Sequence, residues 1–139
     1  MKKREPIGHI MTSNLTTVNV TNSLREVKEI FRDQKIRHLP VVSGDQVVGI
    51  LSETDIRRLS FGSNFGDEHA GADEAILDML SISQVMKEHP NTVDKDDTIK
   101  EVAETLASAE FHALPVTDSG KLVGIVTTTD LIKYLLDQY

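Results

Sequence analysis

Two short segments of the chain pair a hydroxyl with a carboxylate at the same spacing. They read Ser52-x-x-Asp55 and Thr127-x-x-Asp130, and each follows an apolar stretch. A strand that ends here and a helix that begins would offer free backbone N–H groups to a phosphate, with the hydroxyls as extra donors. A carboxylate can also hold both hydroxyls of a ribose. The alternative, which the spacing alone favours, is that both aspartates only cap their helices.

The residues before the two Leu-Pro-Val segments add candidate cations. Arg37 and His38 precede the first segment and His112 precedes the second, each at the expected end of a helix. A guanidinium matches phosphate oxygens at any pH, whereas a histidine can donate to an anion and is partly charged near neutrality. The alternative is that these cations merely sit favourably at helix C-termini. We expect the first site to be richer in charge and the second, with Thr127–Thr129, richer in hydroxyls.

The two candidate sites belong to two copies of one unit. A shift of 75 residues aligns 10–59 with 85–134 without a gap, and 14 of the 50 pairs are identical. Both copies contain a Thr-Val step, a Leu-Pro-Val segment, a Val-Gly-Ile segment and a Thr-Asp step. Chance rarely gives so many identities at one spacing, so the chain is an internal repeat.

Each copy predicts the same order of elements, β-α-β-β-α with a short helix in front. In the first copy these are a helix around Ile7–Met11, an extended Leu15–Val20, a helix opened by Ser23 and Glu26, strands Leu39–Val42 and Gln46–Leu51, and a final helix. The second copy repeats them at Ser83–Glu88, at Asn91–Lys95, from Thr98, at Leu114–Thr117 and Lys121–Val126, and after Thr127. A unit of about 50 residues buries too little apolar area to stand alone. We therefore expect an α+β fold in which two repeats, 7–60 and 82–139, pack about a pseudo-twofold axis. An acidic segment, 61–81, should join them and contain a short helix at Glu74–Leu80.

Composition and charge narrow the classes of function. The chain of 139 residues has a net charge of −7 and no cysteine, which excludes disulfides, zinc–thiolate sites and thiol nucleophiles. No apolar run approaches the ~18–20 residues that span a bilayer, so we expect a cytoplasmic protein. An acidic chain disfavours nucleic acid. Residues 1–59 carry +3 while 60–84 and 85–139 each carry −5, so an anionic ligand should favour the first site.

Metal and catalytic chemistry are poorly supported. The five histidines lack ligand spacing, and Asp67-Glu68-His69 is at most a weak metal site in what reads as a solvated loop. No Walker A, Gly-x-Ser-x-Gly or Gly-x-Gly-x-x-Gly motif occurs. We therefore expect no enzyme and no required metal or cofactor.

The doubled set of motifs resembles the cystathionine β-synthase (CBS) domain, and the tandem resembles a Bateman module. The resemblance covers almost the whole chain and implies a non-catalytic regulatory role. It implies an adenosine-containing ligand (AMP, ADP, ATP or S-adenosylmethionine) in the clefts between repeats. It also implies a homodimer, a disc of four CBS units, that signals through its conformation, like the stand-alone regulators of the acetoin-utilisation type. A protein partner is implied only in general terms.

The resemblance also assigns roles. The aspartates would hold the ribose, the basic residues the phosphates, and the Thr-Val steps the adenine edge, with Ile36, Leu39, Phe111 or Leu114 against its faces. Those four are equally well explained as core. The ligand-binding residues predicted on this basis are Asp55, Asp130, Ser52, Thr127, Thr54, Thr129, Arg37, His38, His112, Thr17, Val18, Thr92, Val93, Leu39, Pro40, Leu114 and Pro115.

Two further expectations complete the hypothesis. Residues 60–73 lack apolar periodicity, and we expect them to be mobile and to fold over a cleft when a ligand binds. The alternative function is a ligand-independent interaction protein that docks on a partner enzyme or transporter. It draws support from Ala113, which stands where a second basic residue could, and from the acidic connecting segment.

Overall fold

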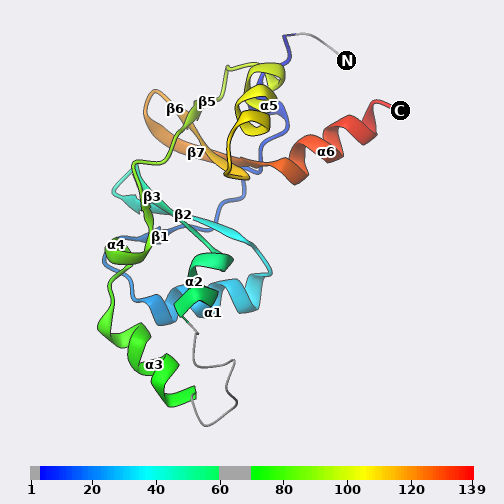
Figure 1. The fold of residues 1–139 in the computed structure, drawn as a ribbon. Coiled ribbons are helices and arrows are strands. Elements are labelled where there is room, and N and C mark those ends of the chain that lie inside the picture. The colour runs from blue at the N-terminus through cyan, green and yellow to red at the C-terminus, as the bar shows by residue number, and fades with distance from the viewer. Residues whose placement is uncertain (1–3, 60–69) are drawn as a thin grey trace. The chain divides into compact units, whose positions relative to one another are not determined.

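The computed structural model describes residues 4–59 and 70–139, which form two compact units (Figure 1). The central unit is Thr16–His89, and the terminal unit combines Met1–Leu15 with Pro90–Tyr139. Each unit has its own sheet and its own apolar core. The described residues form two sheets and six α-helices, which confirms the predicted α+β class.

The elements follow the repeat. In the central unit they are β1 (Val18–Asn19), α1 (Leu24–Gln34), β2 (His38–Ser43), β3 (Gln46–Ser52), α2 (Glu53–Leu59), α3 (Ala70–Met79), α4 (Ile82–Val85) and β4 (Lys87–Glu88). In the terminal unit they are the 3-10 helix η1 (Ile7–His9), β5 (Val93–Asp94), α5 (Ile99–Ser108), β6 (Ala113–Asp118), β7 (Lys121–Thr127) and α6 (Thr128–Asp137).

Each sheet is built on a hairpin with a parallel strand beside it. The central sheet has the order β1-β2-β3-β4 and the terminal sheet the order β5-β6-β7. β1 pairs parallel with β2, as β5 does with β6, because a helix connects the two strands. The hairpin turns hold left-handed residues, Gly44 at φ 63° in one and Ser119 and Gly120 at φ 52° and 85° in the other.

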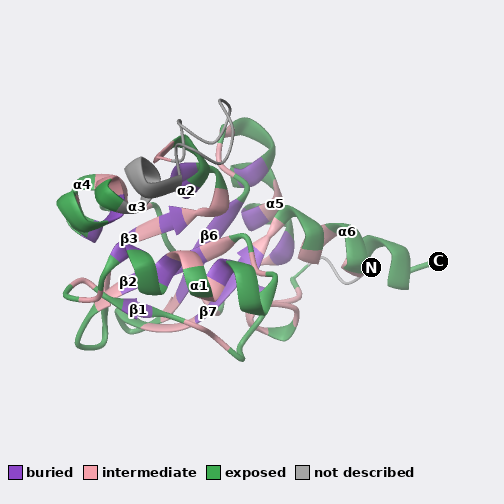
Figure 2. Cartoon of the chain, turned by 90° about the horizontal axis from the view of Figure 1, so that it is seen from below, coloured by how far each residue is buried: buried purple, intermediate pink, exposed green. Residues whose placement is uncertain are grey.

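The helices α1 and α5 begin at the predicted caps and cover their sheets with apolar faces. The hydroxyl of Ser23 accepts from the N–H of Glu26 at 3.2 Å, and that of Thr98 accepts from the N–H of Glu101 at 3.1 Å. Such a cap satisfies one of the free N–H groups of the first turn. Burial concentrates in the strands and the inner helix faces (Figure 2). The core of the central unit includes Leu24, Val27, Phe31, Leu39, Val41 and Leu51. The core of the terminal unit includes Ile99, Val102, Leu106, Leu114, Val116 and Val126.

The first segment of each repeat packs in the unit that holds the other repeat's hairpin. Ile7 is fully buried in the terminal core, and Ile82, 75 residues later, is fully buried in the central core. Thr12 forms a bridge with Ile125 of β7, and Lys87 of β4 pairs with Ile50 of β3. Each compact unit is therefore assembled from both repeats.

A methionine packs closely on a glycine where each of these segments pairs with a hairpin. A Cβ at Gly49 would overlap the sulfur of Met86, and a Cβ at Gly124 would overlap the sulfur of Met11. The two methionines therefore lie over the bare backbone of β3 and β7, where glycine lets another segment approach closely.

Two local predictions were wrong in detail. The helix expected at 83–88 ends at Val85, because Met86 is extended (φ −64°, ψ 156°) and the next two residues join β3 as an edge strand. The residues before the Leu-Pro-Val segment do not end a helix either. α1 stops at Gln34, Lys35 turns left-handed at φ 55°, and Arg37 lies in the link to β2.

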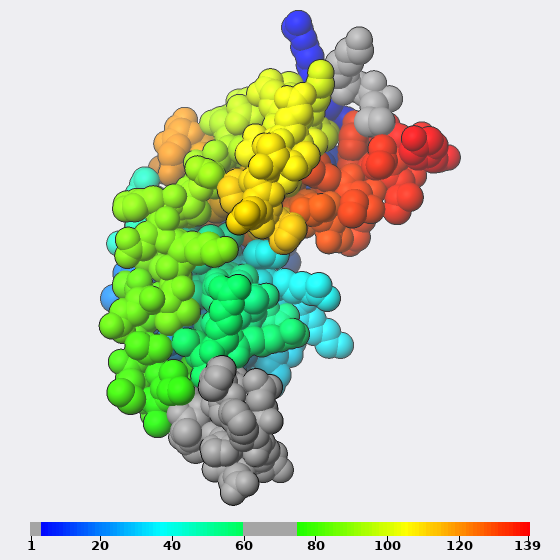
Figure 3. Space-filling view, viewed as in Figure 1, coloured from blue at the N-terminus to red at the C-terminus, as the bar shows by residue number. Residues whose placement is uncertain are grey.

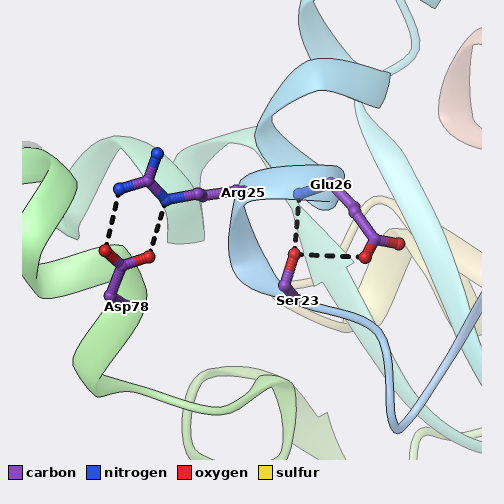
Figure 4. A network of polar contacts seen from close by, with 4 residues as sticks. All are labelled: Ser23, Arg25, Glu26 and Asp78. Atoms are coloured by element: carbon purple, nitrogen blue, oxygen red, sulfur yellow. Dashed lines mark hydrogen bonds and ion pairs between the residues drawn. The ribbon is translucent and has the colours of Figure 1, made fainter.

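The helix α3 confirms the helix expected at 74–80 and begins four residues earlier, at Ala70. Leu77 buries its side chain in the central core, and Arg25 of α1 holds Asp78 in a two-pronged ion pair (Figure 4). The guanidinium donates at 2.6 Å and 2.8 Å. This hydrogen-bonded pair lowers the pKa of Asp78 below its usual value. Of the segment 60–73, proposed to cover a ligand, residues 60–69 lie outside the described part of the chain.

Candidate functional site

The first candidate site is the turn from β3 into α2. The backbone N–H of Ser52 donates to Oδ2 of Asp55 at 2.9 Å, and the N–H of Asp55 donates to Oγ of Ser52 at 3.1 Å. This is a reciprocal cap, in which each residue satisfies the backbone of the other. Asp55 is buried, with 9% of its surface exposed. The remaining oxygen, Oδ1, lies 3.9 Å from Nη1 of Arg58.

The second candidate site repeats that geometry at the turn from β7 into α6. The N–H of Thr127 donates to Oδ2 of Asp130 at 2.9 Å, and the N–H of Asp130 donates to Oγ1 of Thr127 at 3.2 Å. Two turns that are 75 residues apart thus fix a carboxylate in the same orientation. An ionised carboxylate has about four lone-pair positions, so one backbone bond leaves room for ligand hydroxyls.

The backbone also brings the predicted cations to these turns. The carbonyl of Arg37 accepts from the N–H of Glu53 at 2.9 Å, and the carbonyl of His112 accepts from the N–H of Thr128 at 3.0 Å. The first residue of each helix is therefore tied to the residue that precedes the paired strand. The side chains of Arg37 and His112 are exposed, and so are those of Thr54 and Thr129 in the first turns. His38 is partly buried and pairs with Ser52 across the hairpin.

Some of the residues predicted to contact adenine are buried, and others are exposed. Val18 is buried and pairs with Val41, while Val93 is partly buried and pairs with Val116. Their neighbours Thr17 and Thr92 are exposed. The Leu-Pro pairs belong to the buried strands of their own units, and they are Leu39, Pro40, Leu114 and Pro115.

Sequence reasoning missed one residue at the second turn. The hydroxyl of Thr12 lies 3.4 Å from Oδ1 and 3.5 Å from Oδ2 of Asp130. Thr12 reaches the carboxylate because its backbone pairs with Ile125 of β7. The repeat alignment places Thr12 opposite Lys87. This difference between the two copies is the sequence signal that could have drawn attention to the position.

Two further findings concern metal ions and membranes. Among residues 4–59 and 70–139, no group of three or more His, Asp or Glu side chains could hold a metal ion. Asp67-Glu68-His69 lies outside these ranges. Within the described residues, no helix is both long enough and apolar enough to cross a membrane.

Comparison with known proteins gives the family. The model of the CBS domain matches the chain twice, at residues 7–62 and 82–137. A CBS domain-containing protein of Dictyostelium discoideum is 30% identical over 132 residues, which cover 94% of this chain and 90% of that protein.

Solved structures show the same fold. Protein MJ1225 of Methanocaldococcus jannaschii has a TM-score of 0.81 and is 29% identical, and the match covers 97% of this chain but about half (49%) of that one. CBSX2, crystallised in complex with AMP, has a TM-score of 0.79 and is 24% identical, with 96% of this chain and 98% of that chain covered. CBSX2 is thus similar in fold over nearly its full length.

Proposed function

We propose, because the chain belongs to the CBS domain family and carries two CBS domains in tandem, that it is a regulatory module for an adenosine-containing ligand. The observation that carries the proposal is the repeated turn. Ser52 with Asp55 and Thr127 with Asp130 hold two carboxylates in matching reciprocal caps. Each carboxylate keeps acceptor positions for the two hydroxyls of a ribose.

The surrounding side chains supply the rest of the recognition. Arg37 and His112 are tied through their backbones to the first residues of α2 and α6, so each lies at the turn that holds a carboxylate. An exposed guanidinium or imidazole there can meet phosphate oxygens. The AMP complex of CBSX2, a protein of the same fold, supports an adenine nucleotide as the ligand. AMP, ADP, ATP and S-adenosylmethionine all carry the required adenosine.

Titration calorimetry of ligand-stripped protein against these four compounds tests the proposal. We expect at least one of them to bind and to raise the thermal unfolding midpoint. The stabilisation follows mass action and reaches about 2.7 kcal/mol at a hundredfold excess of ligand over Kd. No heat and no thermal shift with any of the four would overturn the adenosine assignment.

We propose further that the module is non-catalytic, forms a homodimer and signals ligand occupancy through the geometry of that dimer. Support for a dimer comes from α6, the red helix in Figure 3, which has no buried residue. It exposes Ile132 (53%), Leu135 (43%) and Leu136 (66%). Apolar side chains gathered on one exposed helix are typical of an interaction surface.

The dimer is tested by light scattering on the wild type and on Leu136→Asp. The wild type should be a dimer at micromolar concentration, and the buried charge should shift Leu136→Asp towards monomer. Lys133→Gln, an exposed polar change on the same helix, should leave the mass unchanged. A monomeric wild type would contradict the proposal, and so would an unaltered dimer of Leu136→Asp.

A ligand-independent docking role is the second candidate function, and the same exposed side chains of α6 favour it. The two functions differ in their response to nucleotide. Co-purification of one partner, with an affinity that is the same with and without AMP or ATP, would favour docking. A partner affinity that changes with nucleotide would favour the regulatory module.

A further inference from the structure

The strand that carries each aspartate site is paired, at equivalent positions, with unlike residues. In the terminal unit, the N–H of Thr12 donates to the carbonyl of Ile125 at 2.8 Å, and the N–H of Ile125 donates back at 3.0 Å. In the central unit, Lys87 pairs antiparallel with Ile50. Ile125 and Ile50 each lie five residues before the aspartate of their site. Thr12 and Lys87 therefore hold equivalent positions on the sheet edge.

The methionine before each residue confirms that the registers are equal. Met11 lies over Gly124 and Met86 lies over Gly49, and each glycine is the strand residue before the paired isoleucine. A side chain at this edge position starts next to the carboxylate, because the short side chain of Thr12 already brings its hydroxyl to 3.4 Å from Asp130. Lys87 is exposed, and its four-carbon stem extends farther than the threonine side chain.

We propose that Lys87 and Thr12 set the charge preference of the two sites, an inference that rests on the proposed adenosine-binding function. Lys87 supplies an ammonium to the Asp55 site, which therefore favours a nucleoside di- or triphosphate. Thr12 supplies a neutral hydroxyl to the Asp130 site, which therefore favours adenosine ligands of lower charge. Lys87 belongs to the second repeat. It comes near the aspartate of the first repeat because the first segment of the second repeat pairs with β3.

Other equivalent pairs point the same way. Where the central unit has Arg37 and His38, the terminal unit has His112 and Ala113. A guanidinium stays charged at neutral pH, whereas alanine carries no charge. The Asp55 site thus has a permanent positive charge nearby, and Lys87 on β4 would add a second.

Calorimetry with adenosine, AMP and ATP, without divalent cations, tests the proposal one site at a time. Asp130→Asn leaves the Asp55 site, and in that background Lys87→Thr should weaken ATP about tenfold while changing adenosine less than about twofold. Asp55→Asn leaves the Asp130 site, and there Thr12→Lys should strengthen ATP about tenfold with little change for adenosine. The ATP preference created by lysine should also shrink as salt is raised.

Lys121→Thr is the matched control, because it removes one exposed lysine at the β6–β7 turn. It should leave the ATP-to-adenosine affinity ratio of both sites unchanged. An ATP-to-adenosine affinity ratio that stays constant in both Lys87→Thr and Thr12→Lys would overturn the inference while the proposed function stands. Failure of the wild type to bind any of these three compounds, ADP or S-adenosylmethionine would overturn the adenosine-binding function itself. Should Lys87→Thr fold poorly, as seen in its unfolding midpoint, the gain expected in Thr12→Lys decides alone.

Discussion

At the scale of single residues, the carboxylates of Asp55 and Asp130 have a structural task that is independent of any ligand. Each accepts from the backbone of the residue three positions earlier and thereby closes the first turn of its helix. The sequence predicted both a capping role and a ribose role for these residues. The capping role is confirmed by the geometry, and the ribose role stays a prediction, because a cap uses only part of the acceptor capacity of a carboxylate.

Substitution of Asp55 tests the capping role through the free energy of unfolding. Asp55→Ala removes the acceptor of the Ser52 N–H and should lower the free energy of unfolding by about 1 kcal/mol. Asp55→Asn keeps an acceptor oxygen and should lose clearly less. Urea denaturation of ligand-free protein measures both values. Equal losses in the two variants would contradict the capping account.

Tyr134 provides a second residue-scale prediction, through its pKa. Its hydroxyl donates to Oε2 of Glu5 at 2.6 Å, and this hydrogen bond raises the pKa of Tyr134 above its ordinary value. The folded pKa lies above the unfolded one, so the stabilisation is complete below the unfolded pKa and is lost as pH rises through the folded pKa. Ultraviolet titration in a Tyr139→Phe background, where Tyr134 is the remaining tyrosine, should show a lower pKa after Glu5→Gln. An unchanged titration curve would show that the contact is absent in solution.

At the scale of elements, local signals were sufficient for most of the repeat. The caps at Ser23 and Thr98, the hairpin turns and the apolar spacing are properties of a few neighbouring residues, and the helices and strands they predicted are present. Residues Lys87–Glu88 were assigned to a helix because a strand of two residues has no pattern of its own. Their conformation depends on pairing with β3, which lies far away in the sequence.

The end of α1 gives a prediction at this scale. Lys35 is left-handed at φ 55°, a conformation that is costly for a residue with a Cβ and that glycine adopts freely. Lys35→Gly should therefore raise the free energy of unfolding by about 0.5–1 kcal/mol. Glu29→Gly, at an exposed position inside α1, is the control and should lower it by about 1 kcal/mol. Destabilisation by both changes would contradict the left-handed cap.

At the scale of the whole molecule, the repeat determines more than the number of copies. The sequence predicted two CBS domains, and the family match confirms them, but the compact units combine segments of both. Ile7 and Ile82 are buried beside the hairpin of the other copy. No short motif reveals this packing, because the partner residues lie far away in the sequence. It also changes the meaning of the charge distribution, since Lys87 lies in an acidic half of the sequence yet joins the unit of Asp55.

The central claim is that each repeated turn binds one adenosine ligand through its aspartate. The most direct test is the calorimetric stoichiometry of the wild type, Asp55→Asn, Asp130→Asn and the double variant, each with AMP, ADP, ATP and S-adenosylmethionine. Asparagine preserves the cap, but its one acceptor oxygen then has a single lone pair left, which cannot accept from both hydroxyls of a ribose. We expect two ligands per chain for the wild type, one for each single variant and none for the double variant. Undiminished binding by the double variant, or no binding by the wild type, would contradict the claim.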